Sequence, residues 1–145
     1  MLKKSSLDKI RRISLNVRRR ILKLSYKYTL SNNNLGGLCG LSSYFLSQEL
    51  LKYFKSTKYC YGFFYRSRTN YCGHAWIEVD DYIVDITATQ FEKVPTTVLI
   101  LRKENANKYK KLVDGKRGLD QLRDWSDWQN PFKWKKQYKK IVGIK

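Results

Sequence analysis

Several residue types that define whole classes of protein are scarce in this sequence of 145 residues. It has one histidine, two prolines and three cysteines, and its apolar stretches stay well below the roughly 18 residues that span a membrane. Three cysteines are too few for a disulfide framework, which favours a reducing, cytoplasmic setting. The N-terminus has the positive charge of a signal peptide without its apolar core, while delivery into a host cell stays open.

Basic residues outnumber acidic ones by 30 to 12, and the excess lies at the two ends of the chain. Residues 1–27 and residues 102–145 each carry a net charge of +9, whereas residues 28–101 are neutral. Such basic flanks indicate either solubility alone or an acidic partner. That partner would be an acidic protein, a nucleic acid or an anionic membrane surface.

The hydrophobic pattern predicts two helices followed by strands. Apolar residues recur at helical spacing from Leu7 to Leu24, which predicts an amphipathic helix capped by Ser5, with its apolar stripe on the core. A membrane-surface helix would share this pattern, but the stripe lacks Trp and Phe. A second helix is expected over 39–54, and after Leu101 the pattern turns polar and helical. We expect strands over 59–66, 73–79, 82–87 and 96–101.

These elements predict a single α+β domain over residues 1–145. Its catalytic core is expected at about 33–101, between the basic flanks 1–27 and 102–145. Three tryptophans of the second flank are expected to anchor that flank on the core: Trp125, Trp128 and Trp134.

The single histidine, His74, lies in a segment whose alternation places it on the same strand face as Glu78. Asp80-Asp81 is a plausible two-residue turn, after which Asp85 returns to that face one diagonal step from His74. An aspartate within an apolar run needs a partner, and His74 is within reach. Glu78 is expected to be a solvated strand residue.

Cys39 follows two glycines and begins the second expected helix, whose positive end favours the thiolate form. A thiolate at a helix start, a histidine on a strand and an aspartate that orients it form a catalytic triad: Cys39, His74 and Asp85. Backbone N–H groups at Cys39 would form half of an oxyanion hole, and Asn33 or Asn34 would supply the other donor. Turn formation is the alternative interpretation of these two asparagines.

Three segments together resemble the core of the papain-like and transglutaminase-like cysteine enzyme superfamily: Gly-Leu-Cys-Gly-Leu-Ser at 37–42, Gly-His-Ala-Trp-Ile-Glu-Val at 73–79 and Val-Asp-Ile-Thr at 84–87. In many bacterial members the order is a helix cysteine, a His-Ala-Trp strand and an Asp-x-Thr strand. Cys39 lies 35 residues before His74, and Asp85 lies 11 residues after it, which fits both gaps. The likeness covers about residues 33–91 and points to small bacterial or phage members. It implies a papain-like (transglutaminase-like) fold, with the nucleophile helix packed on an antiparallel sheet.

A zinc site is a competing interpretation of the three cysteines and the histidine. Against it, the sequence has no closely spaced cysteine pair of the kind that fixes zinc ligands. We therefore expect no metal and no cofactor, and we expect Cys60 and Cys72 to be buried as small apolar residues. Cys72 is near enough to His74 to be a second nucleophile, but it lacks the field of a helix terminus.

The sequence thus predicts a cysteine hydrolase or acyltransferase that attacks an amide bond of a peptide, protein or other substrate through a thioester on Cys39. His74 would be the general base and Asp85 the residue that orients it. Peptidase, amidase, deamidase and transglutaminase chemistry stay open, as does an inactive relative. The alternative is a non-enzymatic basic module that binds nucleic acid or another acidic partner, since Arg18 to Arg20 and residues 133–140 suit phosphate contacts.

Overall fold

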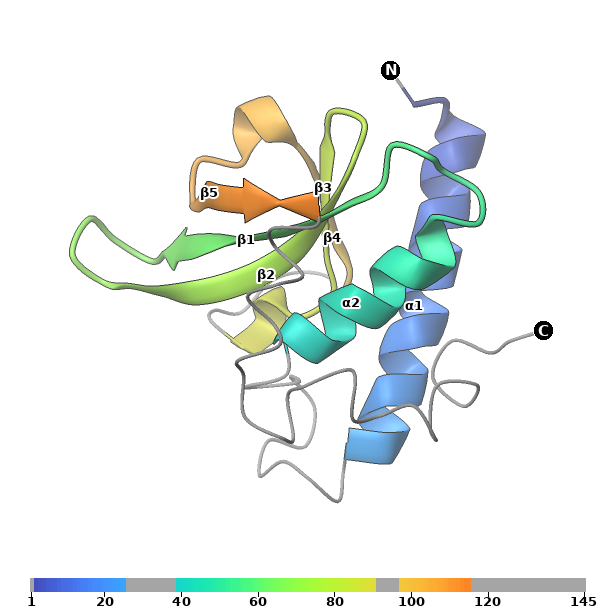
Figure 1. Cartoon of the computed structure of the whole chain (residues 1–145), viewed down its shortest axis with the longest axis horizontal. Helices are drawn as coiled ribbons and strands as arrows, with labels where there is room; N and C mark the ends of the chain where they lie inside the picture. The colour runs from blue at the N-terminus through green and yellow to red at the C-terminus, as the bar shows by residue number, and fades with distance from the viewer. Residues whose placement is uncertain (1, 26–38, 91–96, 116–145) are drawn as a thin grey trace.

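The computed structural model describes residues 2–25, 39–90 and 97–115 of the chain. These residues form two α-helices packed on a five-stranded antiparallel sheet, an α+β architecture as expected (Figure 1). The elements in chain order are α1 (Lys4–Ser25), α2 (Cys39–Leu50), β1 (Lys58–Tyr65), β2 (Tyr71–Val79), β3 (Tyr82–Asp85), η1 (Ala88–Gln90), β4 (Leu99–Arg102), η2 (Lys103–Asn105) and β5 (Tyr109–Asp114). Trp125, Trp128, Trp134 and the basic segment 133–140 lie outside the described residues.

Helix α1 packs its apolar stripe into the core, as the periodicity predicts. The fully buried residues of this stripe are Ile10, Val17 and Ile21. Because the stripe is covered by protein, it is not available to a membrane surface. The expected cap was wrong, since the Leu7 N–H already bonds to the Lys3 carbonyl at 3.0 Å and Ser5 lies inside the first turn.

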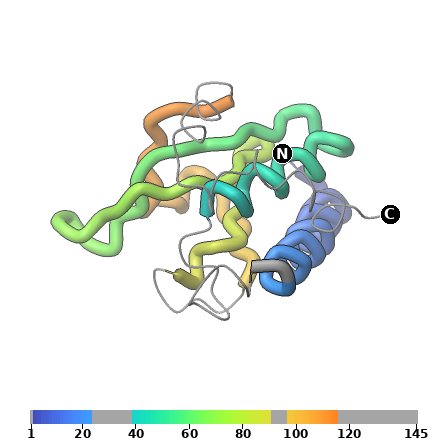
Figure 2. Tube along the Cα trace, turned by 60° about the horizontal axis from the view of Figure 1, so that its bottom comes forward, coloured from blue at the N-terminus to red at the C-terminus, as the bar shows by residue number. Residues whose placement is uncertain are grey.

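Helix α2 contacts α1 on one side and strands β1 and β2 on the other (Figure 2). It runs from Cys39 to Leu50, so it ends before Phe54, the expected last residue; the residues directly before Cys39 lie outside the described part of the chain. The Leu50 carbonyl accepts the N–H groups of both Tyr53 and Phe54, at 3.0 and 2.8 Å, so the chain turns back toward β1. Among the described residues, no helix is long and apolar enough to cross a membrane.

The strand order of the sheet is β4-β3-β2-β1-β5. The predicted turn at Asp80 and Asp81 is confirmed, because Val79 pairs with Tyr82 across it. Asp80 adopts a left-handed φ of 53°, a conformation that aspartate tolerates better than most residues. On the other side of β2, the β1–β2 hairpin extends to the end of the molecule farthest from α1 in both views (Figures 1 and 2).

Strand β5 is the main element that the sequence pattern does not predict. Residues after Leu101 were expected to be helical, but only the short turn η2 forms before Tyr109–Asp114 pairs antiparallel with β1. The register of this pair shifts between Tyr61 and Gly62. A Cβ atom on Gly62 would lie 2.0 Å from the Lys110 carbonyl oxygen, so this close approach requires glycine.

Two apolar clusters flank the sheet. The larger joins both helices to one set of strand side chains, and its sheet residues include Tyr59, Ala75, Ile77, Val79 and Val84. The smaller gathers Cys60, Trp76, Ile83 and Ala106, with Leu101 and Tyr109 packed against them. His74 therefore lies on a strand that is covered on both sides.

Candidate active site

The three residues of the predicted triad come from three elements that meet around β2. Cys39 is the first residue of α2, and its side chain is buried in the apolar cluster under the helices. The Ser43 hydroxyl, one helical turn later, donates to the Ala75 carbonyl at 3.1 Å. This bond fixes the first turn of α2 against the residue that follows His74.

His74 and Asp85 form a fully buried pair. The His74 Nε2 atom lies 2.7 Å from Asp85 Oδ2, and neither side chain is exposed to solvent. Burial by itself would lower the pKa of His74, but the charge and hydrogen bond of Asp85, together with those of Cys39, raise it to about 10. At neutral pH this pair therefore favours an imidazolium next to a carboxylate.

Asp85 accepts four hydrogen bonds. Besides His74, Oδ2 accepts the Tyr109 hydroxyl at 2.7 Å, while Oδ1 accepts the Thr87 N–H at 2.9 Å and the Thr87 hydroxyl at 3.2 Å. Burial opposes ionisation, but the His74 charge and the bonds from His74, Tyr109 and Thr87 outweigh it and lower the pKa of Asp85. The carboxylate is thus held ionised and in one orientation.

Cys39 lies within electrostatic reach of the His74 ring. Its interaction with the imidazole is among the smaller causes of the raised pKa of His74, after the charge and hydrogen bond of Asp85. Asp85 binds the Nε2 atom, and Nδ1 is the second, buried nitrogen of the same ring. The structure thus pairs His74 directly with Asp85 and keeps Cys39 close enough to influence the charge of the imidazole.

Tyr61 of β1 also reaches this region. Its hydroxyl lies where a Cβ atom on Gly73 would approach within 2.8 Å, so the glycine before His74 leaves room for it. Burial first, and then the charge of Cys39, raises the pKa of Tyr61. The residue before His74 is therefore a glycine because a larger side chain would collide with the Tyr61 hydroxyl.

Arg18 enters the site region from α1 and is 3% exposed. Its guanidinium donates to the Ile86 carbonyl and, at 3.4 Å, to the Thr89 hydroxyl. Burial lowers the pKa of Arg18, while the Asp85 carboxylate raises it. The expectation that Arg18 belongs to an exposed phosphate-binding run is therefore wrong, because its charge is used inside the protein.

The other two cysteines have different surroundings from Cys39. Cys60 is fully buried, as expected, and this burial, followed by the charge of Glu78, raises the pKa of its thiol. Cys72 is exposed, so the expectation that it is buried was wrong. It lies near the outer end of β2, where the apolar clusters no longer cover the strand. Among the described residues, no three His, Cys, Asp or Glu side chains form a group able to hold a metal ion.

Glu78 shares the alternation of His74 but has a separate role. It was expected to be solvated, yet it is 5% exposed, and its Oε1 atom pairs at 3.0 Å with both Lys103 and Lys111. These two lysines come from η2 and the missed strand β5, so the local sequence around Glu78 cannot reveal them. Asn33 and Asn34, the expected oxyanion-hole donors, lie outside the described residues.

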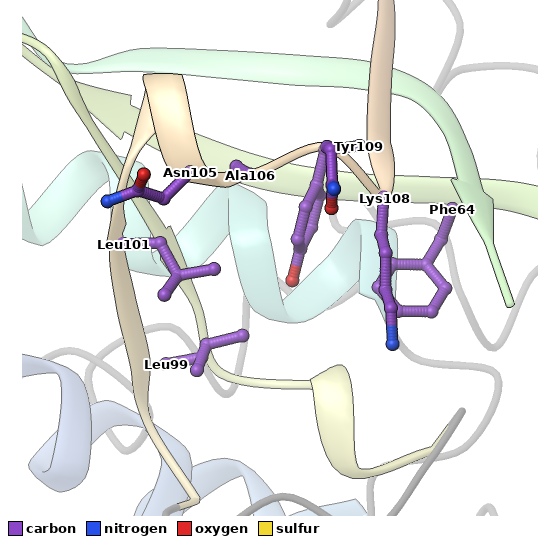
Figure 3. Close-up of a pocket in the computed structure, with 8 residues that line it drawn as sticks. Phe64, Leu99, Leu101, Asn105, Ala106, Lys108 and Tyr109 are labelled. Atoms are coloured by element: carbon purple, nitrogen blue, oxygen red, sulfur yellow. The ribbon is translucent and has the colours of Figure 1, made fainter.

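A cavity of about 220 Å³ is lined in part by Tyr109 and Phe64 (Figure 3). Its walls are mostly apolar and come from β1, β4 and the segment from η2 to β5: Phe64, Leu99, Leu101, Asn105, Ala106, Asn107, Lys108 and Tyr109. Of these lining residues, Tyr109 donates a hydrogen bond to Asp85, and the ring centroid of Phe64 lies 6.0 Å from that of His74.

Sequence reasoning missed two residues that act on Asp85, namely Tyr109 and Arg18. Neither belongs to a local motif, and each is 24 or more residues from its partner in the sequence.

Comparison of the chain with protein-family models, with curated proteins and with solved structures gives no match. The geometry around His74 is therefore the ground on which a function has to be argued.

Proposed function

We propose that this protein is a papain-like or transglutaminase-like cysteine enzyme that attacks an amide bond through Cys39. The observation that carries this proposal is the buried His74, bonded through Nε2 to Asp85 at 2.7 Å and within electrostatic reach of the thiol in the first turn of α2. A fully buried ionic pair is costly to form unless the fold or the chemistry uses it. A cysteine beside that pair gives it a use.

The reaction follows from the order of the three groups. The Cys39 thiolate attacks the amide carbonyl carbon, an S–C bond forms, and the carbonyl oxygen takes up negative charge. His74, as imidazolium, gives its Nδ1 proton to the departing nitrogen as the C–N bond breaks, which leaves a thioester and a neutral imidazole. A water or an amine then loses a proton to His74 and attacks the thioester, and the thiolate is released.

Asp85 has two effects in this cycle. It keeps the proton of Nε2 in place, so that Nδ1 faces the sulfur, and it stabilises the imidazolium that exists before the amine leaves. The Thr87 bonds hold the second carboxylate oxygen and prevent the group from rotating. The acceptor of the second step decides between a peptidase, an amidase, a deamidase and a transglutaminase, all of which share these steps.

The reactivity of the three cysteines tests the proposal directly. Iodoacetamide at pH 6.5, followed by peptide mass spectrometry, gives a separate alkylation rate for Cys39, Cys60 and Cys72. An ordinary thiol is only about 1% thiolate two pH units below its pKa, so we expect Cys39 to react about 10- to 100-fold faster than exposed Cys72. Cys60→Ser and Cys72→Ser are the matched controls and should leave the Cys39 rate unchanged. A Cys39 rate no higher than that of Cys72 would reject the thiolate and with it the enzyme.

A non-enzymatic interaction with a polyanion is the second candidate, and the exposed surface of α1 favours it. The basic residues on this surface are Lys4, Arg11, Arg12, Arg19 and Lys23. With the apolar stripe buried, this basic side is what α1 presents to a partner. Retention on a heparin column should then fall steeply with salt, because bound counterions are released. Retention that hardly changes with salt would leave the charge a matter of solubility.

A further inference from the structure

Tyr109 lies on β5, outside the segments that resemble the cysteine enzymes, yet its side chain reaches the centre of the site. Its hydroxyl donates to Asp85 Oδ2 at 2.7 Å, the oxygen that also binds His74 Nε2 at 2.7 Å. Two donors on one carboxylate oxygen fix both the position of that oxygen and its charge. Tyr109 is therefore in contact with the residue that orients the proposed base.

Aromatic neighbours fix the ring of Tyr109. Its centroid lies 5.2 Å from those of Phe64 and Trp76, at interplanar angles of 84° and 73°, which are edge-to-face contacts. The Tyr109 N–H also bonds to the Ala106 carbonyl at 3.1 Å, which ties the residue to the end of η2. The hydroxyl is thus aimed at Asp85 by packing that does not depend on the hydrogen bond itself.

The charged groups that face Asp85 come from several elements. His74 on β2 bears a positive charge next to Oδ2, Arg18 on α1 adds a second positive charge, and Cys39 on α2 acts through His74. Strand β4 places the apolar Leu99 opposite Asp85. Tyr109 is a neutral donor, as Thr87 is, but it donates to Oδ2, the oxygen that also binds His74, so it stabilises this oxygen without competing for charge with the imidazolium.

On the assumption that the proposed function is correct, we propose that Tyr109 is a positioning residue, whose hydroxyl keeps Asp85 ionised and aligned with His74 for the chemistry at Cys39. Its neutral hydroxyl leaves the proton on Nε2, because a carboxylate that already accepts a strong bond attracts that proton less. The Tyr109 ring also lines the cavity of Figure 3, so packing does not enclose the ring completely. The hydrogen bond to Asp85 is what the hydroxyl adds beyond packing.

Tyr109→Phe separates the hydroxyl from the ring. Without this donor Asp85 takes up a proton at higher pH, and a neutral Asp85 no longer supports the His74 imidazolium. We measure the Cys39 alkylation rate as a function of pH, and the acidic limb is the part of this profile where the rate rises with pH. In Tyr109→Phe we expect this limb to shift to higher pH by about one unit, so that the rate at a given pH on the limb is about tenfold lower. Tyr71→Phe, at an exposed position of β2, is the matched control and should not move the profile. If the acidic limb of Tyr109→Phe coincides with that of the unmodified protein, the inference is wrong. Tyr109 then contributes only packing, even if the variant has a lower melting temperature.

Two further measurements keep the inference testable if Tyr109→Phe folds poorly. Because the chain has one histidine, NMR of the unmodified protein should show a protected Tyr109 hydroxyl proton close to the His74 ring. Absence of that proton would overturn the inference. In the Asp85→Asn background, Tyr109→Phe should cause no further shift of the profile, and a full shift there would also overturn it. A Cys39 that reacts no faster than Cys72 in the unmodified protein overturns instead the proposed function.

Discussion

Neighbouring residues of β2 belong to two very different environments. Ala75, Ile77 and Val79 are fully buried with the helices in an apolar cluster, whereas His74 and Glu78 are buried among charged partners. Apolar burial stabilises a fold directly, while buried ion pairs contribute little net stability and can be replaced by apolar groups at no loss. The comparison teaches that the first set supports the fold and that the second set needs another reason to be there.

Replacing Asp85 by Asn should produce the largest effect, and the effect should be on reactivity. The variant keeps the shape of the side chain but loses the charge that supports the imidazolium. We expect hydrolysis of an activated ester by Cys39 to fall about 10²–10⁴-fold, with His74→Ala at least as low. The double variant should be little worse than either single one, because the residues act as a unit. If the pair is only structural, Asp85→Asn would lower the melting temperature and leave the ester rate intact.

Ile77→Ala is the converse change on the helix-packed side of the strand. It removes apolar volume from a fully buried site, so the free energy of unfolding should fall by about 2–5 kcal/mol. The measurement is urea unfolding, with Cys39 alkylation below the transition as the second readout. We expect the alkylation rate of the folded fraction to be unchanged. A rate loss as large as that of Asp85→Asn would mean that the two environments are not separable.

Two glycines sharpen the comparison at the place where β5 meets β1. An added Cβ at Gly62 would meet rigid backbone at 2.0 Å, whereas at Gly73 it would meet the Tyr61 hydroxyl at 2.8 Å, the movable end of a side chain. Gly62→Ala should therefore cost about 1–3 kcal/mol of unfolding free energy, and Gly73→Ala clearly less. Equal costs for the two variants, measured by urea unfolding, would show that β5 can move away from β1 without loss.

The pH dependence of stability should arise from the buried pair of His74 and Asp85 and not from the apolar residues of β2. The raised pKa of His74 contributes stability that is complete below the ordinary value of 6.5 and is lost as the pH rises through about 10. The lowered pKa of Asp85 contributes stability that is present above its ordinary value of 3.8 and is lost at lower pH. The melting temperature should therefore be highest between about pH 3.8 and pH 6.5, and it should decline gradually as the pH rises from 6.5 toward about 10. In His74→Ala the decline above pH 6.5 should disappear, and its persistence would assign it to other groups.

Part of this arrangement could be read from the sequence, because it depends on local patterns. The alternation around His74 and the Asp80-Asp81 turn predict the register that places Asp85 within reach of His74. These signals are short in range.

The residues that sequence reasoning missed depend instead on contacts between distant segments. Strand β5 is an edge strand whose outward residues are largely exposed, so it shows no apolar alternation that would reveal Tyr109. Arg18 was assigned to the solvent side because a basic residue is seldom buried, and its burial is compensated by distant partners that include the Ile86 carbonyl and the Asp85 carboxylate. Neither contact has a signature within its own segment.

The pairing of β5 with β1 also sets the order in which the protein can become complete during its synthesis. Domains form on the ribosome from the N-terminal end, and Cys39, His74 and Asp85 are all made before Tyr109. Until residue 109 has left the ribosome and β5 has added to the edge of β1, Asp85 lacks one of its four hydrogen bonds. A nascent chain thus makes Asp85 early and completes its hydrogen bonds late, when β5 adds to the sheet.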